Sequence, residues 1–309
     1  MSLRKPSPSR ARVACLALPM VIALAAAPVG QDRSTNTTPR RLPGGAFEAS
    51  GVVGVPGASA AVFVDDSRPR HVFLLALSDT GIASVPEPIA LGASVNDLED
   101  ITTDGTWYYA VGSQSKGVGR RAPGLVRFRL DVASRRVTTI ESVADLERIM
   151  VAAVPELAGL VRRNREGVNI EGLAWDAARD RLLFGLRSPM IGGEAVMVVA
   201  RIGDRGARLS ARSLAFEPEL VRLNLGGLAV RGLGSDPSTG HVLVIGGAAT
   251  DDPRTAFRLF DWDGEGPVAP AAGRAIASAE KPEGVTRVLT GGRMRTLVVF
   301  DLSAYQLLD

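Results

Sequence analysis

The sequence predicts an all-β protein built from one repeated unit, and three observations lead to that prediction. From Ala49 onward, short apolar runs alternate with Gly, Asp, Ser and Pro, a pattern typical of many short strands. Long amphipathic helices are nearly absent. A short motif also recurs wherever a new unit begins, and its clearest copy is VNIEGLAWD at Val168–Asp176.

The other copies of this motif set the number of units. They begin at Asn96, Leu223 and Lys281, with a fainter copy at Ala49, so the five starts are spaced by about 45 to 75 residues. Such a period, with about four strands in each unit, is typical of a β-propeller, in which the innermost strands line an axial channel. We therefore predict about five blades, with a six-bladed ring or a sandwich as the alternatives.

Turn signals divide each unit into strands in chain order. The clearest is Asp104-Gly105, a strong hairpin signal in the second unit. The predicted strands are Val52–Val55, Ala60–Val64, His71–Leu77 and Ile82–Ile89; Asp100–Thr103, Thr106–Gly112, Leu125–Leu130 and Val137–Ser142; Gly172–Trp175, Arg181–Leu186, Ala195–Ile202 and Arg208–Phe216; Leu228–Leu233, His241–Ile245, Ala256–Trp262 and Gly273–Ala277; Val285–Leu289 and Leu297–Phe300.

Two segments depart from this scheme. The fifth unit is short, and we expect Pro43–Glu48 near the other terminus to supply its closing strand. Ser142–Arg163 has apolar residues at helical spacing, interrupted by Pro155, and predicts two short helices with Ser142 as N-cap. We expect this insertion, at about 142–163, to cover the channel mouth or a blade edge.

The N-terminus is predicted to be a signal peptide. Basic residues between Arg4 and Arg12 precede the apolar run Val13–Ala27, which is shorter than the ~20 residues that span a bilayer. The expected organisation is a signal peptide at 1–27, a flexible segment at 28–45 and one propeller domain at 46–309. A secreted or periplasmic location follows.

Composition limits the partners of the processed chain. Removal of Cys15 with the leader leaves no cysteine and hence no disulfide framework. The four basic residues lost with it leave 32 Lys and Arg against 33 Asp and Glu, a net charge of −1 with neutral histidines. This balance gives no case for nucleic acid or for a membrane beyond the leader. We expect a monomer.

Strand geometry predicts where polar side chains should meet. The start of the first strand of a blade lies beside the end of its antiparallel second strand, so all these points share one face. The expected neighbours are Glu99 with Ser113 and Ser115, Glu171 with Arg187 and Ser188, Glu283 with Asp301, Ser50 with Asp65-Asp66, and Asn224 with Gly246-Gly247. The result would be an acidic ring at the channel mouth, made of Asp97, Glu99, Glu171, Glu283 and Asp65, with Arg187 and Arg231 as counter-charges.

Two interpretations of this ring stay open. Converging carboxylates repel one another unless a cation neutralises them, and hard oxygen ligands suit Ca²⁺ or Mg²⁺. Alternatively, each Glu accepts backbone N–H groups from the next blade and acts as a structural clamp.

Other motifs mainly exclude functions. His71 and His241 each open an apolar run after a turn and are expected at strand edges. No metalloprotease, thiol-redox, lipase-type or P-loop spacing occurs. The loop from Gly112 to Lys116, followed by Arg120-Arg121, could receive an anion such as phosphate or could be solvated.

Several motifs together resemble a bacterial family called domain of unknown function 3616. They are LEDIT at Leu98–Thr102, YAVGSQS at Tyr109–Ser115, NIEGLA at Asn169–Ala174, LFGLRSP at Leu183–Pro189, GGLAVR at Gly226–Arg231 and PEGV at Pro282–Val285. The resemblance spans about Ala49 to Asp301. The family looks like a propeller and is distantly similar to secreted propellers described as esterase-like phytases.

The phytase likeness implies phosphoester hydrolysis with bound Ca²⁺. It would make Glu99, Glu171 and Glu283 metal ligands and Arg187 and Arg231 phosphate-binding residues. The sequence departs from this pattern at Gly226, where a carboxylate is expected, and at Asp100, where Gly is expected.

These expectations combine into two hypotheses. The first is an exported propeller that binds a divalent cation, with Ca²⁺ as the expected cofactor, and a small anionic or ester ligand. Hydrolysis would use a metal-bound water, with Arg187, Arg231 and Ser113 as catalytic candidates and Asp97, Glu99, Glu171 and Glu283 as ligands. The second is a non-catalytic binding or scaffold propeller of the cell envelope.

Overall fold

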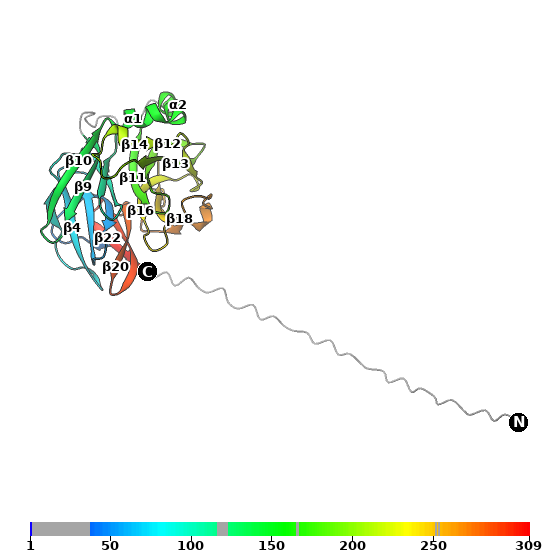
Figure 1. The fold of residues 1–309 in the computed structure, drawn as a ribbon. Helices are drawn as coiled ribbons and strands as arrows, with labels where there is room; N and C mark the ends of the chain where they lie inside the picture. The colour runs from blue at the N-terminus through cyan, green and yellow to red at the C-terminus, as the bar shows by residue number, and fades with distance from the viewer. Residues whose placement is uncertain (2–37, 116–122, 165–166, 251, 253) are drawn as a thin grey trace. The chain divides into compact units, whose positions relative to one another are not determined.

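A computed structural model describes Met1 and residues 38–115, 123–164, 167–250, 252 and 254–309. The predicted signal peptide, apart from Met1, and the basic residues Lys116, Arg120 and Arg121 lie outside these ranges. Within them, five antiparallel sheets follow one another along the chain (Figure 1). In the described part of the chain, no helix has the length and apolar character needed to cross a membrane.

The first two blades follow the predicted order of strands. Blade I consists of β2 (Ala49–Gly54), β3 (Ala60–Asp65), β4 (His71–Ser78), β5 (Gly81–Ile82) and β6 (Glu87–Ala90). Blade II consists of β7 (Leu98–Thr103), β8 (Tyr108–Gly112), β9 (Pro123–Asp131) and β10 (Arg136–Ala144). In blade I, β2, β3, β4 and β5 pair in that order from the innermost β2, and β6 pairs with β4. In blade II, each strand pairs with the next, from the innermost β7 to β10.

Blades III and IV repeat this arrangement. Blade III consists of β11 (Asn169–Asp176), β12 (Arg181–Ile191), β13 (Glu194–Ile202), β14 (Leu214–Phe216) and β15 (Val221–Leu223), with a 3₁₀ turn at Ala211–Ser213. Blade IV consists of β16 (Ala229–Ser235), β17 (Val242–Gly247), β18 (Arg258–Trp262) and β19 (Arg274–Ala275), with a 3₁₀ turn at Pro270–Ala272.

Blade V contains strands from both ends of the described chain. Its order is β20 (Pro282–Thr290), β21 (Arg293–Phe300), β22 (Ala304–Leu308) and then β1 (Arg40–Arg41). The prediction that the N-terminal segment completes this sheet is confirmed, but its location at Pro43–Glu48 is wrong. Arg40 and Arg41 pair with Tyr305 and Ala304, and Leu42 then leaves the sheet to enter the core.

The helical insertion lies between blades II and III, as expected. α1 (Leu146–Ala153) and α2 (Pro155–Asn164) lie side by side (Figure 1). Leu146 and Met150 of α1 are buried in the core shared by these blades. The N-cap position is Asp145, because β10 continues through Ser142 to Ala144. The predicted N-cap at Ser142 is therefore wrong.

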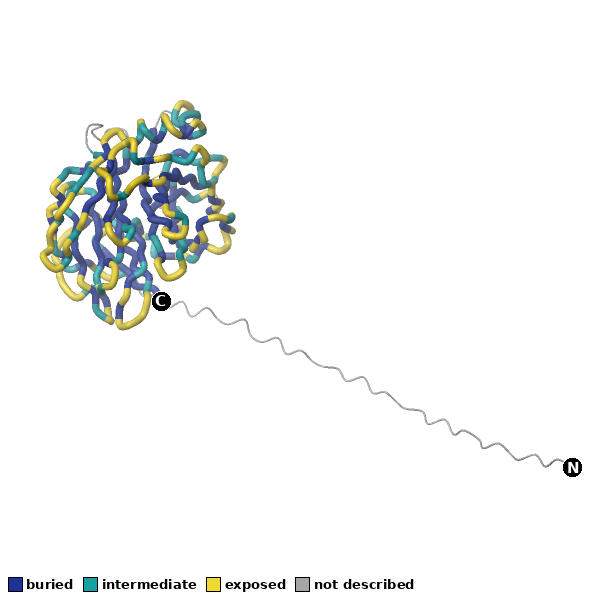
Figure 2. The backbone as a smooth tube through the Cα atoms, in the orientation of Figure 1, coloured by how far each residue is buried: buried dark blue, intermediate teal, exposed yellow. Residues whose placement is uncertain are grey.

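Five hydrophobic clusters prove that the ring is closed. Each cluster lies between two adjacent sheets, so every sheet is covered on both faces. Strand alternation produces this: in β17, Val242 and Val244 face blade III, while Leu243 and Ile245 face blade V. Figure 2 shows the resulting buried strands inside a shell of exposed loops. The five-bladed prediction is confirmed.

The axis between the blades is packed with backbone. β16 contacts the other four innermost strands, β2, β7, β11 and β20. A β-carbon on Gly232 would overlap the carbonyl oxygen of Glu283, and one on Gly54 would lie 2.5 Å from the carbonyl oxygen of Arg287. The expected axial channel is therefore filled at these levels, because small residues let the strands touch.

Candidate functional site

Each innermost strand carries a β-bulge at the corresponding place near its start. The register with the second strand skips one residue in every blade, which leaves that residue without a partner. A bulge of this kind redirects a side chain and increases the local twist. We call the five bulged residues the bulge cluster: Ser50, Glu99, Glu171, Arg231 and Glu283.

Buried ion pairs join three members of the bulge cluster. Glu171 of blade III contacts Arg231 of blade IV at 2.6 Å, and Arg231 also contacts Glu283 of blade V at 2.6 Å. The second oxygen of Glu171 accepts a hydrogen bond from Arg187 at 2.9 Å. Side-chain exposure is only 6% for Glu171 and 7% for Arg231, so these charges are largely removed from water. The expected role of both arginines as counter-charges is realised here.

Glu99 differs from the other carboxylates of the cluster. Among described residues, no hydrogen-bond or ion-pair partner of its side chain is found. Burial raises the pKa of Glu99 well above its usual range, and the nearby charges of Glu171, Glu283 and Asp97 raise it further. Glu99 therefore binds a proton more readily than a solvent-exposed glutamate.

Glu283 is also shifted, although it has a counter-charge. Burial raises its pKa to about 8, against the lowering effect of Arg231, and the charges of Glu171 and Asp301 raise it as well. The predicted proximity of Glu283 to Asp301 agrees with this coupling. Asp301 itself pairs with Lys281 at 2.9 Å.

Asp97 and Ser113 form a local polar unit beside Glu99. The hydroxyl of Ser113 donates to the Asp97 carboxylate, and the Ser113 amide donates to the Asp97 carbonyl at 3.0 Å. The Ser113 carbonyl accepts from the Ile170 amide at 2.8 Å, which connects blade II to blade III. Glu99 was the expected neighbour of Ser113 and Ser115, but the carboxylate that their hydroxyl groups contact is that of Asp97.

An acidic group in blade I extends this face. One carboxylate oxygen from each of Glu48, Asp65 and Asp66 lies within 4.8 Å of the others. Arg68 contacts Asp65 at 3.3 Å, whereas burial and the neighbouring Glu48 raise the pKa of Asp66 to about 8. Asp65 and Asp66 were expected here. Glu48 was not, because it precedes the strand and lacks the repeat pattern.

Asp100 has a role that the sequence analysis did not assign. Its carboxylate accepts from the amides of Leu173 at 2.7 Å, Leu233 at 3.1 Å and Ile101 at 2.8 Å, so it joins blades II, III and IV. Burial nevertheless raises its pKa, against the effect of these three bonds. The clamp proposed for the glutamates is thus formed by Asp100, at the one position where the repeat has Asp in place of Gly.

In blade IV, the residue at the bulge is not the one that the comparison of the motif copies predicted. Gly226 and Gly227 precede β16, are exposed and have positive φ, while the bulged residue is Arg231. The alignment of Gly226 with the glutamates, and the expected pairing of Asn224 with Gly246-Gly247, are therefore wrong for this site. Arg231-Gly232-Leu233 repeats the order of Glu171-Gly172-Leu173 with the opposite charge, and this signal was present in the sequence.

Oxygen donors suitable for a hard cation remain beside Glu171. The buried Oδ1 of Asn169 accepts no hydrogen bond from any residue described, while its amide nitrogen donates to Glu171 at 3.3 Å. Glu99, also adjacent to Glu171, supplies the second unpartnered group. Carboxylate and amide oxygens are the ligands that Ca²⁺ prefers. Among the described residues, however, three acidic side chains whose oxygens lie within 4.8 Å of one another are found at Glu48, Asp65 and Asp66 and not at Asp97, Glu99, Glu171 and Glu283.

Comparison with known proteins supports the predicted resemblance. Residues 160–306 match the family described as "Protein of unknown function (DUF3616)". The family resemblance is confirmed over these residues. The DUF3616 match includes Glu171, Arg187, Arg231 and Glu283 but not Glu99, and it is narrower than the predicted span of Ala49 to Asp301. No curated protein matches the chain.

Solved structures with similar folds include several enzymes. One described as a putative gluconolactonase has 15% identity and a TM-score of 0.44, with 87% of this chain and 91% of that chain covered. A glucose dehydrogenase has 12% identity and a TM-score of 0.45, covering 88% and 98%. Glutaminyl cyclase of Myxococcus xanthus has 12% identity and a TM-score of 0.45, covering 85% and 90%. These likenesses concern the fold alone.

Proposed function

We propose that the bulge cluster binds a divalent cation, best matched by Ca²⁺, together with a small anionic or ester ligand, and that a phosphoester or ester is hydrolysed there. The observation that carries this proposal is the unpartnered Oδ1 of Asn169 beside Glu171, together with the Glu99 carboxyl, which interacts electrostatically with Glu171. An unpaired carboxyl in a buried acidic cluster is costly unless a proton or cation neutralises it.

The cation would be held by Glu99 and Asn169, with Asp97 and the partly neutralised Glu171 and Glu283 around it. When bound, such an ion supplies Lewis-acid polarisation of an ester oxygen. Arg187 and Arg231 border the same carboxylates and would hold the negative charge of the ligand. The hydroxyl of Ser113 donates a hydrogen bond to the Asp97 carboxylate, so the role of Ser113 would be to orient that carboxylate.

Calcium-dependent melting of the full chain tests the cation site. We expect CaCl₂ to raise the melting temperature of the wild type. Glu99→Gln should abolish this increase, because the uncharged amide cannot balance the positive charge of the ion. Glu219→Gln, at an exposed glutamate of blade III, is the matched control and should retain it. Assays with phosphomonoesters and simple esters, with and without CaCl₂, then test hydrolysis. A wild type that shows no shift with any divalent ion contradicts the proposal.

A second candidate function is a non-catalytic binding or scaffold propeller of the cell envelope. The ion pairs from Glu171 through Arg231 to Glu283 favour it, because they join blades III, IV and V without any ligand. Glu171→Gln distinguishes the two. In the hydrolase it should remove calcium-dependent activity from a folded protein, whereas in the scaffold its main effect should be a lower melting temperature.

We further propose that the chain is exported, on the basis of the basic and apolar residues between Arg4 and Ala27. N-terminal sequencing of protein recovered from the periplasm or medium should find a start near Ala27. Recovery of the uncleaved chain in the cytosol alone would rule this out.

A further inference from the structure

A pocket lies at the end of the ring opposite the bulge cluster. The turns between the first and second strands of all five blades contribute to it, and its volume is about 420 Å³. Along β16, Arg231 of the bulge cluster and Ser235 of the pocket are four residues apart, about 13 Å in a strand. Because the strands touch at the axis between these levels, the pocket is separate from the proposed catalytic site.

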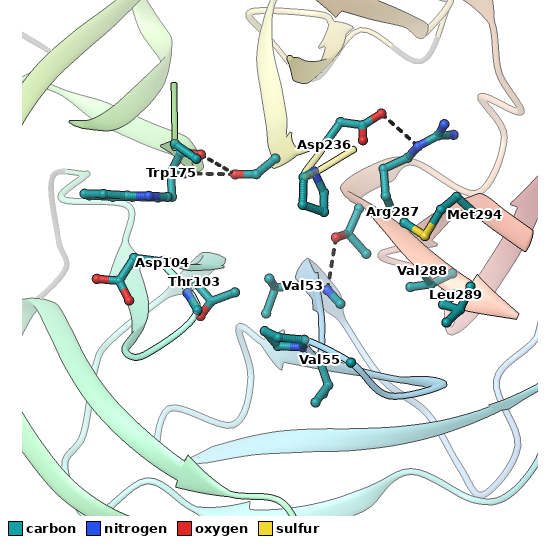
Figure 3. A pocket seen from close by; sticks show the side chains of 18 of the residues that line it. Val53, Val55, Thr103, Asp104, Trp175, Asp236, Arg287, Val288, Leu289 and Met294 are labelled. Atoms are coloured by element: carbon teal, nitrogen blue, oxygen red, sulfur yellow. Dashed lines mark hydrogen bonds and ion pairs between the residues drawn. The ribbon is translucent and has the colours of Figure 1, made fainter. Parts of the chain in front are cut away.

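Apolar groups dominate the lining of this pocket. Figure 3 shows Val53, Val55, Trp175 and Val288 around a central space, with Leu289 and Met294 at its edge. Leu289 and Met294 are 40% and 36% exposed, which makes them two of the few large apolar side chains open to solvent among described residues. Blades I, III, IV and V thus deliver apolar side chains to one pocket, while blade II contributes Thr103, Asp104 and Gly105.

The charged groups of the lining are already neutralised within the protein. Asp236 pairs with Arg287 at 2.9 Å, visible as a dashed line in Figure 3. Asp104 accepts from the Tyr109 hydroxyl at 2.9 Å and lies 3.4 Å from Arg205. His241, the other ionisable side chain of the lining, contacts Asp261 at 2.6 Å, so each ionisable group of the lining has a partner within the protein.

Hydroxyl groups of the lining are also engaged. Ser235 donates to the Trp175 carbonyl at 2.7 Å, and Thr103 donates to the Trp107 carbonyl at 2.8 Å. A ligand that brought its own charge would have to be desolvated without a counter-charge in return. The lining therefore selects for an uncharged molecule.

We propose that this pocket, which we name the turn pocket, binds a small, uncharged and predominantly apolar molecule. Its volume falls within the range of pockets for small ligands, roughly 300–1,000 Å³, which are also mostly apolar. Trp175 lines the pocket with its indole stacked on Tyr109, so the small exposed part of the ring adds to the apolar lining. This site is independent of the cation and ester chemistry proposed for the bulge cluster.

Titration of the full chain with the uncharged fluorophore N-phenylnaphthylamine tests the proposal. We expect saturable enhancement of its emission at one molecule per chain, with quenching of tryptophan emission through Trp175. Ala177→Trp, at an exposed position that lines the pocket, should raise the dissociation constant at least tenfold by filling the space. Ala178→Trp, in the same turn but outside the lining, is the control and should change it less than twofold.

A second pair of variants tests whether the weaker binding could come from a change in the turn that holds Ala177 and Ala178, and not from the pocket. Leu289→Asp should weaken binding by adding charge at the edge, whereas Leu302→Asp, an exposed leucine on the opposite end, should not. Unchanged melting temperatures would show that all four variants fold. Emission that never saturates, or equal affinities in each matched pair, would overturn the proposal. So would a wild-type dimer that Leu289→Asp dissociates, because a second copy would then occupy the pocket.

Discussion

The buried carboxylates of this protein differ in the partners that offset the free-energy cost of their burial. Asp100 accepts hydrogen bonds from three backbone N–H groups, and Glu171 pairs with two arginines. For Glu99, no hydrogen bond or ion pair with a described residue is found. Residue type alone would treat these three acids as equivalent. Their surroundings make one a structural clamp, one an ion-pair centre and one a candidate ligand.

Loss of the Asp100 carboxylate is expected to be severe. Asp100→Ala leaves the amides of Ile101, Leu173 and Leu233 without their acceptor, and each unsatisfied buried donor costs about 1–3 kcal/mol. We expect a loss of roughly 3 kcal/mol or more in the free energy of unfolding, measured with urea. Asp131→Ala, which removes a carboxylate that caps an exposed turn, should cost clearly less. Equal losses would show that Asp100 is no clamp.

The pH dependence of stability should report the shifted pKa of Asp66. Its pKa rises from 3.8 to about 8 on folding, so between these values the folded chain binds more protons than the unfolded chain. The free energy of unfolding should therefore fall as pH increases through this window, by at most about 1.4 kcal/mol per pH unit for one group.

Asp66→Asn removes this titration and should flatten the decline, while Asp79→Asn, at an exposed aspartate, should leave it unchanged. The measurement is urea unfolding at several pH values between 4 and 8. A slope that Asp66→Asn does not alter would show that Asp66 is not the group responsible.

At the scale of the elements, the bulge is the feature that positions the site. In a regular strand, successive side chains point to opposite faces, so each would enter one of the two interfaces between blades. The extra residue lets a polar side chain leave that alternation at the corresponding position in every blade, and this side chain is charged in all blades but blade I, which has Ser50. Arg231 shows that the position can take either charge.

Arg231→Met tests the connection between blades. It leaves Glu283 without its counter-charge and Glu171 with Arg187 alone, and breaking a buried ion pair on one side costs about 3–5 kcal/mol. Arg222→Met breaks a more exposed pair with Glu156 and should cost no more than about 1 kcal/mol. Urea unfolding compares the two variants. Adding Glu283→Gln to Arg231→Met should recover part of the loss, and the absence of any recovery would contradict the assigned pair.

For the molecule as a whole, closure of the ring decides stability. The edge of β22 pairs with Arg40 and Arg41, and Leu42 packs with Phe47 in the cluster between blades I and V. Ser303 fixes the same segment, because its hydroxyl accepts from the Phe47 amide at 2.6 Å and its carbonyl accepts from the Leu42 amide at 2.8 Å. Residues at opposite ends of the sequence thus share one interface.

Leu42→Ala should weaken this closure without touching any other blade. Creation of a cavity at a buried leucine costs about 2–5 kcal/mol, and we expect one cooperative thermal transition at a lower temperature. Val85→Ala, at a side chain that is 53% exposed, should melt like the wild type. Two separate transitions in the wild type would indicate that the blades do not unfold as one unit.

The sequence alone determined the all-β class, the number of blades, the helical insertion and the set of acids near strand starts. These features depend on short-range patterns such as alternation, turns and a repeated motif, which are written along the chain. Only the tertiary structure decided that Arg231 occupies the fourth bulge, that Asp100 is the clamp, that β1 is Arg40–Arg41 and that a pocket lies at the opposite end. Each of these depends on contacts between residues far apart in sequence, and on which polar atoms find partners once the ring has closed.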